Sequence, residues 1–446
     1  MTTASSAVST TSSTVLGGAL ALTIALTIGG LTGRARAADP IVVQVTSIGG
    51  PAPVTASGSS LLDILEDAIE SQGAFAGFDG TAFTASLAVG GVADVATVAV
   101  NAAGTSATLS FPLIGFSQTF TGSDEEDLQE QIEDFIQQDG ASTYARVIDA
   151  LNQRSLIAVV DGNPGSATAR LGLASFRRWG LAPTWTPSIT VAGDAFTDGS
   201  RLRLDLAASI LERGDFDSTA ASLGLSGGLA INDSIGLALS GLVVYEDIEG
   251  ADMVQAGLEL ALPITLLGDR VREIAVDPAA DADGNGAADH GARTEPGGLR
   301  LQLTPFAAAG LGGSVDLGQG ASFWGLGAAA SLGVDLGPVT LSGGASFTQY
   351  GGIDLDYDDY EFQTDVDQRL LTIGGLASLP LGDGLSLSAG LSWSTYLDDA
   401  AVEDWINPEV ALSLGSPSFR ARLGWIGTFA DDVDGHAPQL GLQWGF

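Results

Sequence analysis

The chain of 446 residues contains no cysteine and no lysine, so all 17 of its basic residues are arginines. The absence of cysteine excludes disulfides, thiolate metal sites and cysteine nucleophiles. Only two histidines are present, and 54 acidic residues bring the formal net charge to −37. Nucleic-acid binding needs basic side chains that replace the counterions of the phosphates, and this chain has few of them. We therefore expect no nucleic-acid partner.

Long hydrophobic runs are also missing: beyond the N-terminus, no apolar stretch is long enough to cross a bilayer as a helix. Hydrophobic residues nevertheless make up 45% of the chain, and 61 residues are glycine. A hydrophobic chain without a helical span can cross a membrane only as a closed β-barrel, because every backbone polar group must be paired inside the bilayer. The composition therefore favours a membrane β-barrel.

The N-terminal segment reads as an export signal. An apolar run over residues 15–28 is followed by Ala35-Arg36-Ala37, which has the small-x-small form of a signal-peptidase site. We therefore predict a signal peptide over residues 1–37. A permanent anchor is the less favoured alternative, because the run is short for a membrane span. Export without cysteine suits an oxidising periplasm or the cell surface.

Residues 38–165 combine helical and strand-like patterns, which predict a small soluble α+β domain. Ser123 and Glu126 have the spacing of a capping box at the start of an acidic helix that ends near Gly140. Apolar spacing predicts two more helices, one after Ser59 and one over residues 143–153. The predicted strands are 41–45, 83–89, 95–100, 105–111 and 156–160. The domain has no histidine, which excludes Ser/His catalysis within it.

From about residue 167 onward, apolar residues alternate with small or polar ones. Leu385, Leu387 and Leu391, for example, lie on one face of a strand whose other face is serine and glycine. The predicted strands have 9–13 residues, long enough to cross a bilayer at a tilt, whereas soluble strands average about five or six. Residues 166–446 are therefore predicted to form a transmembrane antiparallel β-barrel, which makes the chain mainly β.

The last strand alternates in the same way, with Leu440, Leu442, Trp444 and Phe446 on one face. Here the chain resembles the outer-membrane β-barrel proteins of Gram-negative bacteria, over residues 167–446 or about 60% of its length. The resemblance implies a location in the cell outer membrane, with outer-membrane lipid around the barrel. It also implies that these four residues are an assembly signal for the barrel-assembly machinery.

Charge decides which face of each strand points inward. An arginine facing lipid at the membrane midplane would cost about 2–4 kcal/mol. Arg201, Arg203, Arg420 and Arg422 alternate with apolar residues, so all four are predicted to face the lumen. Serine and glycine dominate the other inward positions, which predicts a polar lumen without a large plug.

Strand counting leaves two arrangements. Thirteen strands can be counted from residue 188 onward, whereas single-chain bacterial barrels have an even number. A further strand at residues 167–176 would give fourteen and place the 38–165 domain in the periplasm. If residues 188–196 instead run through the lumen, the barrel has twelve strands and presents the domain outside, as an autotransporter does. The domain is short and lacks solenoid repeats, so fourteen is favoured.

One acidic segment resembles a calcium loop. Asp281, Asp283, Asn285 and Asp289 supply oxygens at positions 1, 3, 5 and 9, but position 12, which needs an acid, is alanine. A flexible acidic linker explains the same residues about as well, so Ca²⁺ is a weak candidate and no other cofactor is expected.

A second acidic cluster lies in a predicted outer loop, at Asp354, Asp356, Asp358 and Asp359. It could concentrate cations at the barrel mouth, although a solvated loop is the simpler interpretation. His290 and His436 fall in different predicted loops, and neither is accompanied by a nucleophile. We therefore expect no enzymatic activity.

The favoured function is a passive channel for small solutes with a mild preference for cations. An autotransporter-like barrel that displays the 38–165 domain at the cell surface is the alternative, and a non-conducting structural or adhesin barrel stays open because side chains can fill a narrow barrel. The sequence leaves open whether the protein forms an oligomer.

Overall fold

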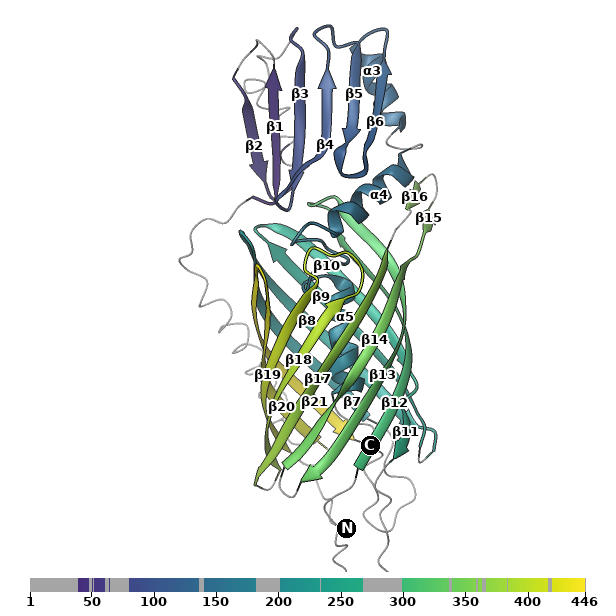
Figure 1. Ribbon diagram of the computed structural model, residues 1–446, viewed down its shortest axis with the longest axis vertical. Helices are drawn as coiled ribbons and strands as arrows, with labels where there is room; N and C mark the ends of the chain where they lie inside the picture. Colours follow the sequence, from purple (N-terminus) through teal and green to yellow (C-terminus); the bar gives the residue numbers. More distant parts are fainter. Residues whose placement is uncertain are drawn as a thin grey trace, which may run out of the picture.

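The computed structural model describes residues 39–445 except 48–49, 51, 61–63, 65–79, 136–139, 182–200, 233, 268–298, 337–338, 358–359, 363–365, 383 and 416–418. The predicted signal peptide, most of the helix after Ser59, the calcium-loop residues and Phe446 lie outside the described residues. A tall barrel carries a smaller sheet-and-helix region at one end (Figure 1). None of the described helices is long and apolar enough to span a membrane.

Twelve strands of the described chain close into an antiparallel barrel. The ring closes where β21 pairs with β7, from Val433↔Arg213 to Gly445↔Arg201, and where β10 pairs with β12. The barrel strands are β7 (Arg201–Arg213), β8 (Phe216–Ala230), β9 (Gly236–Ile248), β10 (Ala251–Ala261), β12 (Leu299–Ser314), β13 (Gln319–Leu336), β14 (Val339–Gly352), β17 (Asp367–Gly382), β18 (Leu385–Tyr396), β19 (Asp404–Gly415), β20 (Phe419–Ala430) and β21 (Val433–Gly445). The favoured count of fourteen was therefore wrong, and the alternative of twelve is confirmed.

Three short strands lie outside this ring. β11 (Ile264–Leu267) extends the pairing of β12, and β15 (Leu355–Tyr357) forms a small hairpin with β16 (Tyr360–Phe362) in the connection between β14 and β17. That connection is the predicted acidic outer loop. It lies at the same barrel end as the sheet-and-helix region (Figure 1).

The barrel is apolar outside and polar inside. Large aliphatic side chains such as Leu258 (63% exposed) and Leu423 (62% exposed) point away from the lumen. The alternate positions carry buried polar side chains, among them Gln302, Thr304, Thr372 and Ser394. This is the reverse of a soluble protein, and it is the arrangement of a barrel that spans a membrane. The predicted transmembrane antiparallel β-barrel is confirmed.

The sheet-and-helix region contains six antiparallel strands in the order β2-β1-β3-β4-β5-β6. They are β1 (Ile41–Ser47), β2 (Val54–Gly58), β3 (Phe83–Val89), β4 (Val92–Val100), β5 (Ser106–Phe111) and β6 (Phe116–Thr121), with the short η2 (Pro112–Ile114) between the last two. Helices α3 (Glu125–Asp134) and α4 (Ala141–Asn152) follow. The predicted strand over residues 156–160 was wrong: this segment is an irregular connection, buried from Ile157 onward.

The two faces of this sheet differ. Helix α3 packs Leu128 and Phe135 onto Leu109 and Phe120, and α4 packs Val147 onto the β3–β4 end of the same face. On the opposite face, cross-strand neighbours are mostly hydroxyl side chains, and some bond directly, as Thr108 does to Thr119 at 3.0 Å. The hydroxyl face comprises Thr46, Thr55, Ser57, Thr84, Ser86, Thr97, Ser106, Thr108, Ser110, Ser117, Thr119 and Thr121.

Helix α3 begins with a capping box, displaced by one residue from the predicted one. The Asp124 carboxylate, rather than the Ser123 hydroxyl, accepts from the Asp127 amide at 3.0 Å. In return the Ser123 amide donates to the Asp127 carboxylate at 2.7 Å, which holds the pKa of Asp127 below its usual value. The predicted partner Glu126 is exposed and is not part of the box.

We expect Asp124→Ala to destabilise the start of α3 by about 1 kcal/mol, because an orphan amide loses its acceptor. Hydrogen exchange of the α3 amides measures this, and Glu126→Ala is the control, with an expected change under about 0.5 kcal/mol. Because the folded pKa of Asp127 is lowered, its stabilising contribution is present above the ordinary carboxyl pKa and is lost as the pH falls through the folded value. Equal effects of the two substitutions would contradict the displaced box.

The sheet-and-helix region rests on the barrel end formed by the β7–β8, β9–β10 and β12–β13 turns (Figure 1). Ile41 and Ile64 from the small region share one buried cluster with Phe216, Ile248 and Leu317 from these strand ends and turns. The Tyr144 hydroxyl of α4 also donates to the Gly318 carbonyl. β7 begins and β21 ends at the opposite end of the barrel.

Candidate functional site

A helix occupies the barrel lumen (Figure 1). It consists of α5 (Ala167–Ser175) followed by one wider turn, η4 (Phe176–Gly180), in which the Leu181 amide donates to the Phe176 carbonyl at 3.0 Å. We call residues 167–180 the plug. The predicted strand over residues 167–176 was therefore wrong, and so was the expectation of a lumen without a large plug.

Small residues let the plug fit between the barrel walls. Ser166 caps the helix, its hydroxyl accepting from the Ala169 amide. A Cβ at Gly172 would lie 2.3 Å from a terminal methyl group of Leu370 of β17, so a larger residue there would displace the Leu370 side chain. One side of the plug is partly exposed, and the rest is buried against the wall. The partly exposed residues are Arg170, Leu173, Ala174, Arg177 and Arg178. Because this side mixes arginines with apolar residues, the helical periodicity of the sequence is weak.

Three wall glutamates hold the plug, and the first is Glu259 of β10. It accepts from the Trp179 indole nitrogen at 2.7 Å, from the Ser175 hydroxyl and from the Arg178 guanidinium at 3.4 Å. Glu259 is 1% exposed, so its charge depends on these donors in place of water. One wall carboxylate thus fixes the last turns of the plug.

The second glutamate, Glu246 of β9, lies between two arginines. Arg170 of the plug approaches it at 2.7 Å, and Arg213 of β7 approaches its other oxygen at 2.5 Å. The Ser218 hydroxyl also donates to Glu246 at 2.6 Å. The Arg213 side chain is fully buried, so this group is a charged cluster within the packed part of the lumen.

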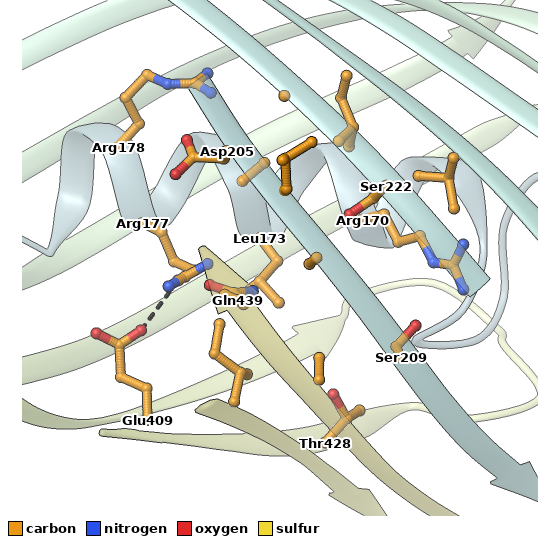
Figure 2. Close-up of a pocket in the computed structure, with 18 of the residues that line it drawn as sticks. Arg170, Leu173, Arg177, Arg178, Asp205, Ser209, Ser222, Glu409, Thr428 and Gln439 are labelled. Atoms are coloured by element: carbon orange, nitrogen blue, oxygen red, sulfur yellow. Dashed lines mark hydrogen bonds and ion pairs between the residues drawn. The ribbon is translucent and has the colours of Figure 1, made fainter. Parts of the chain in front are cut away.

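The third glutamate, Glu409 of β19, also joins two arginines. Arg177 of the plug and Arg422 of β20 each lie 3.0 Å from one of its oxygens. Figure 2 shows Arg177 reaching from the plug to Glu409, while Arg178 extends away from that contact. The three glutamates therefore take one plug arginine each.

Hydrogen bonds between uncharged groups hold the N-terminal end of the plug to the barrel wall. The Tyr396 hydroxyl of β18 pairs with Ser166 at 3.0 Å and Thr168 at 2.9 Å. Gln255 of β10 donates to the carbonyls of Val159 and Gly165 at 3.0 and 2.9 Å. Through these contacts the buried segment that precedes the plug closes the barrel end beneath the sheet-and-helix region.

A cavity of about 260 Å³ remains on the β7, β20 and β21 side of the plug (Figure 2). Its polar lining includes Ser209, Ser222, Thr428 and Gln439. Its charged lining consists of five arginines and two acids, namely Arg170, Arg177, Arg178, Arg203, Arg422, Asp205 and Glu409. The plug thus narrows the lumen without filling it.

The structure brings two of the four predicted lumen arginines to this cavity. Arg422 binds Glu409, and Arg203 pairs with Asp205 at 2.8 Å. Arg420 occupies the next inward position of β20 but does not line the cavity, and the side chain of Arg201 lies outside the described residues.

The predicted assembly residues Leu440, Leu442 and Trp444 follow the outward register of β21, where Trp444 packs on Phe419 with ring centroids 5.8 Å apart. Their role in assembly stays a prediction.

The other predicted sites receive less support. Asp354 is exposed before β15, whereas the side chains of Asp356, Asp358 and Asp359 lie outside the described residues. In the described part of the chain, no three metal-ligating side chains come together. His436 was wrongly assigned to a loop: it lies in β21, 3.5 Å from Asp434 and beside Trp425.

Sequence reasoning missed the plug arginines and the three glutamates. A usable signal existed for Glu259 and Glu409, each of which is the one charged residue in the alternating middle of its strand, whereas Glu246 is followed directly by Asp247. A carboxylate in such a strand must face inward and needs a buried partner. The partners could be sought among arginines of other strands, such as Arg422, and among arginines outside the strands.

A closed antiparallel ring with an apolar belt and a polar, charged lumen defines an outer-membrane β-barrel. No family model matches the chain, and no curated protein matches it by sequence. The search of solved structures found barrels of two kinds.

Two of these structures are autotransporter barrels. The translocator domain of NalP from Neisseria meningitidis has a TM-score of 0.36 and 11% identity, covering 63% of this chain and 98% of its own. The beta domain of the Bordetella autotransporter Brka has a TM-score of 0.37 and 11% identity, covering 56% of this chain and 100% of its own. A Pseudomonas aeruginosa FadL homologue has a TM-score of 0.31 and 12% identity, covering 60% of this chain and 96% of its own.

Proposed function

We propose that this protein is an outer-membrane display barrel, which holds the sheet-and-helix region at the cell surface through its own plugged lumen. The observation that carries this proposal is the continuity of the chain from α4 through the buried segment into the plug. A plug that also leads to a separate folded region acts as a stalk. The three glutamates and the Tyr396 seal would hold that stalk in place.

The orientation follows from the connections between strands. At the end opposite the sheet-and-helix region, β13–β14 and β17–β18 are joined by two-residue turns, and β19–β20 by three residues. At the near end, β14–β17 and β18–β19 have longer connections, whereas β7–β8, β9–β10 and β20–β21 are joined by two residues each. Because these barrels have short periplasmic turns and longer external loops, the two longer connections favour placing the sheet-and-helix region outside. The two-residue turns of the near end and the long connection after β11 do not follow this pattern.

What is displayed is the hydroxyl face of the sheet together with the helical face behind it. The hydroxyl face is uncharged at its twelve defining positions, although the chain as a whole has a net charge of −37. An uncharged polar surface suits contact with other neutral polar surfaces. The β15–β16 hairpin of the acidic loop lies beside α4, on the helical side of the sheet. A structural or adhesive role fits this surface better than catalysis does.

An epitope tag inserted between Ala102 and Ala103, in the turn between β4 and β5, tests the orientation. We expect antibody to reach this tag on intact cells, and added protease to remove it. A matched tag at Gly384, in the β17–β18 turn, should react only after the outer membrane is permeabilised. The reverse pattern would place the sheet-and-helix region in the periplasm and end the display proposal.

A passive channel is the second candidate, favoured by the cavity that remains beside the plug. Under this proposal small solutes would cross the barrel through the space beside the plug, or the plug would move to open the lumen. We expect the wild-type barrel to show little conductance in planar bilayers, because the plug and the Tyr396 seal close the lumen. Sustained conductance of the intact protein would favour the channel over the display barrel. The mild cation preference, recognition by the assembly machinery, oligomer formation and the calcium loop stay predictions.

A further inference from the structure

The cavity beside the plug has an excess of positive charge. Glu246 is shared by Arg170 and Arg213, and Glu409 is shared by Arg177 and Arg422. Arg178 forms an ion pair with Glu259, and Arg203 forms one with Asp205. Among these residues, six arginines meet four carboxylates, so the arginines exceed the carboxylates by two.

One of the two excess charges belongs to the Glu409 group, whose three members all line the cavity. Arg422 lies close enough to Arg177 and Arg203 to be repelled by both, and Arg203 also repels Arg178. These side chains are only partly exposed: 19% for Arg177, 26% for Arg422 and 33% for Arg203. Arg177 and Arg422 are the less exposed two of the three and share one carboxylate, so a second counterion nearby would stabilise them.

We propose that this cavity binds a small oxyanion, a phosphate or carboxylate group, between Arg177 of the plug and Arg203 and Arg422 of the wall. The planar guanidinium fork suits such groups, because two parallel N–H donors match two oxygens. The neutral lining, with Ser209, Thr428 and Gln439, offers further hydrogen-bonding groups around the anion. The volume of about 260 Å³ admits an ion of this size together with water.

The bound anion would join the plug to the wall. Arg177 belongs to η4, whereas Arg203 and Arg422 belong to β7 and β20. An oxyanion that contacts both sets therefore stabilises the plugged state in addition to Glu409. The proposal does not depend on which end of the barrel is outside, so it can fail or succeed separately from surface display.

Phosphate binding to the full-length protein, folded in detergent micelles, tests the site. Calorimetric titration with inorganic phosphate at constant ionic strength should show saturable binding, and chloride should not reproduce it. Arg422→Gln should weaken phosphate binding about tenfold, since it removes one excess charge while Glu409 keeps Arg177 as its partner. Arg420→Gln is the matched control, because Arg420 faces inward on the same strand but does not line the cavity.

Glu409→Gln provides the opposite change. It removes a carboxylate between Arg177 and Arg422, so phosphate should bind more tightly, by a similar factor. A merely structural effect would weaken binding in both variants. If Glu409→Gln fails to fold, judged by heat-modifiable gel mobility, the comparison of Arg422→Gln with Arg420→Gln still decides. Absence of saturable binding to the wild type, equal binding of chloride, or equal loss in both arginine variants would each overturn the proposal.

Discussion

Deleting the plug, residues 167–180, is expected to turn a closed barrel into an open pore. A barrel of eight strands is just filled by its own side chains, and diameter grows with strand number, so twelve strands leave a wide lumen once the helix is gone. We expect single-channel conductance in planar bilayers to rise roughly tenfold or more over the wild type. The triple variant Glu246→Gln, Glu259→Gln, Glu409→Gln should produce intermittent opening, because the plug loses its three charged anchors.

The control for this experiment is Asp335→Asn. Asp335 pairs with Arg300 at 2.7 Å near the far end of the barrel and has no contact with the plug. It should leave the conductance of the barrel low. A plug deletion that folds, as judged by gel mobility, but stays non-conducting would show that wall side chains or another segment close the lumen. That result would contradict the role assigned to the plug.

The ion selectivity of the open pore follows from the same contacts. Removing the plug takes away Arg170, Arg177 and Arg178 and leaves three wall glutamates with fewer partners. The open pore should therefore prefer cations, and the preference should weaken at high ionic strength, because screening acts over about 8 Å at physiological salt. Anion selectivity would show that the wall arginines dominate. The predicted cation preference would thus apply to the unplugged barrel.

The sequence was sufficient to predict the barrel because the alternating pattern is long, regular and repeated. Leu385 to Trp393 is a strand in which each residue's face can be assigned by counting, and a membrane gives that assignment a large energetic consequence. The strands β3 and β5 of the small region were found for the same reason. β2 and β6 were missed, since five or six residues with mixed burial give a weak pattern.

The plug could not be predicted in this way. Residues 167–176 alternate between small and large residues, which matches a strand as well as a helix. The only partly exposed side of the plug mixes Arg170, Arg177 and Arg178 with Leu173 and Ala174, so the amphipathic period that identifies surface helices is weak. The even-number rule for barrel strands accepts twelve as readily as fourteen, and the short domain without solenoid repeats then favoured the wrong count. The inward glutamates were the signal that further positive side chains, beyond the predicted lumen arginines, enter the barrel.

Replacing Glu246 by glutamine is expected to cause the largest loss of stability of any single substitution considered for the lumen. Glu246 is the shared counter-charge of Arg170 and Arg213, and the side chain of Arg213 has no exposure to water. Glutamine keeps the shape but removes the charge, so two arginines lose their shared partner. Breaking a buried ion pair by removing one member costs about 3–5 kcal/mol. Urea unfolding of the barrel in lipid vesicles measures this loss.

The matched control is Asp205→Asn, which removes the partner of Arg203 in the same lumen. Both members of that pair are about a third exposed, 33% and 35%, so water screens the charges and the expected loss is under about 1 kcal/mol. A second variant identifies the cause: adding Arg213→Met to Glu246→Gln should recover part of the stability, because the fully buried unpaired charge is gone. Equal losses from Glu246→Gln and Asp205→Asn, or no recovery in the double variant, would mean that packing around Glu246 matters more than its charge. The role of the three glutamates as electrostatic anchors would then have to be given up.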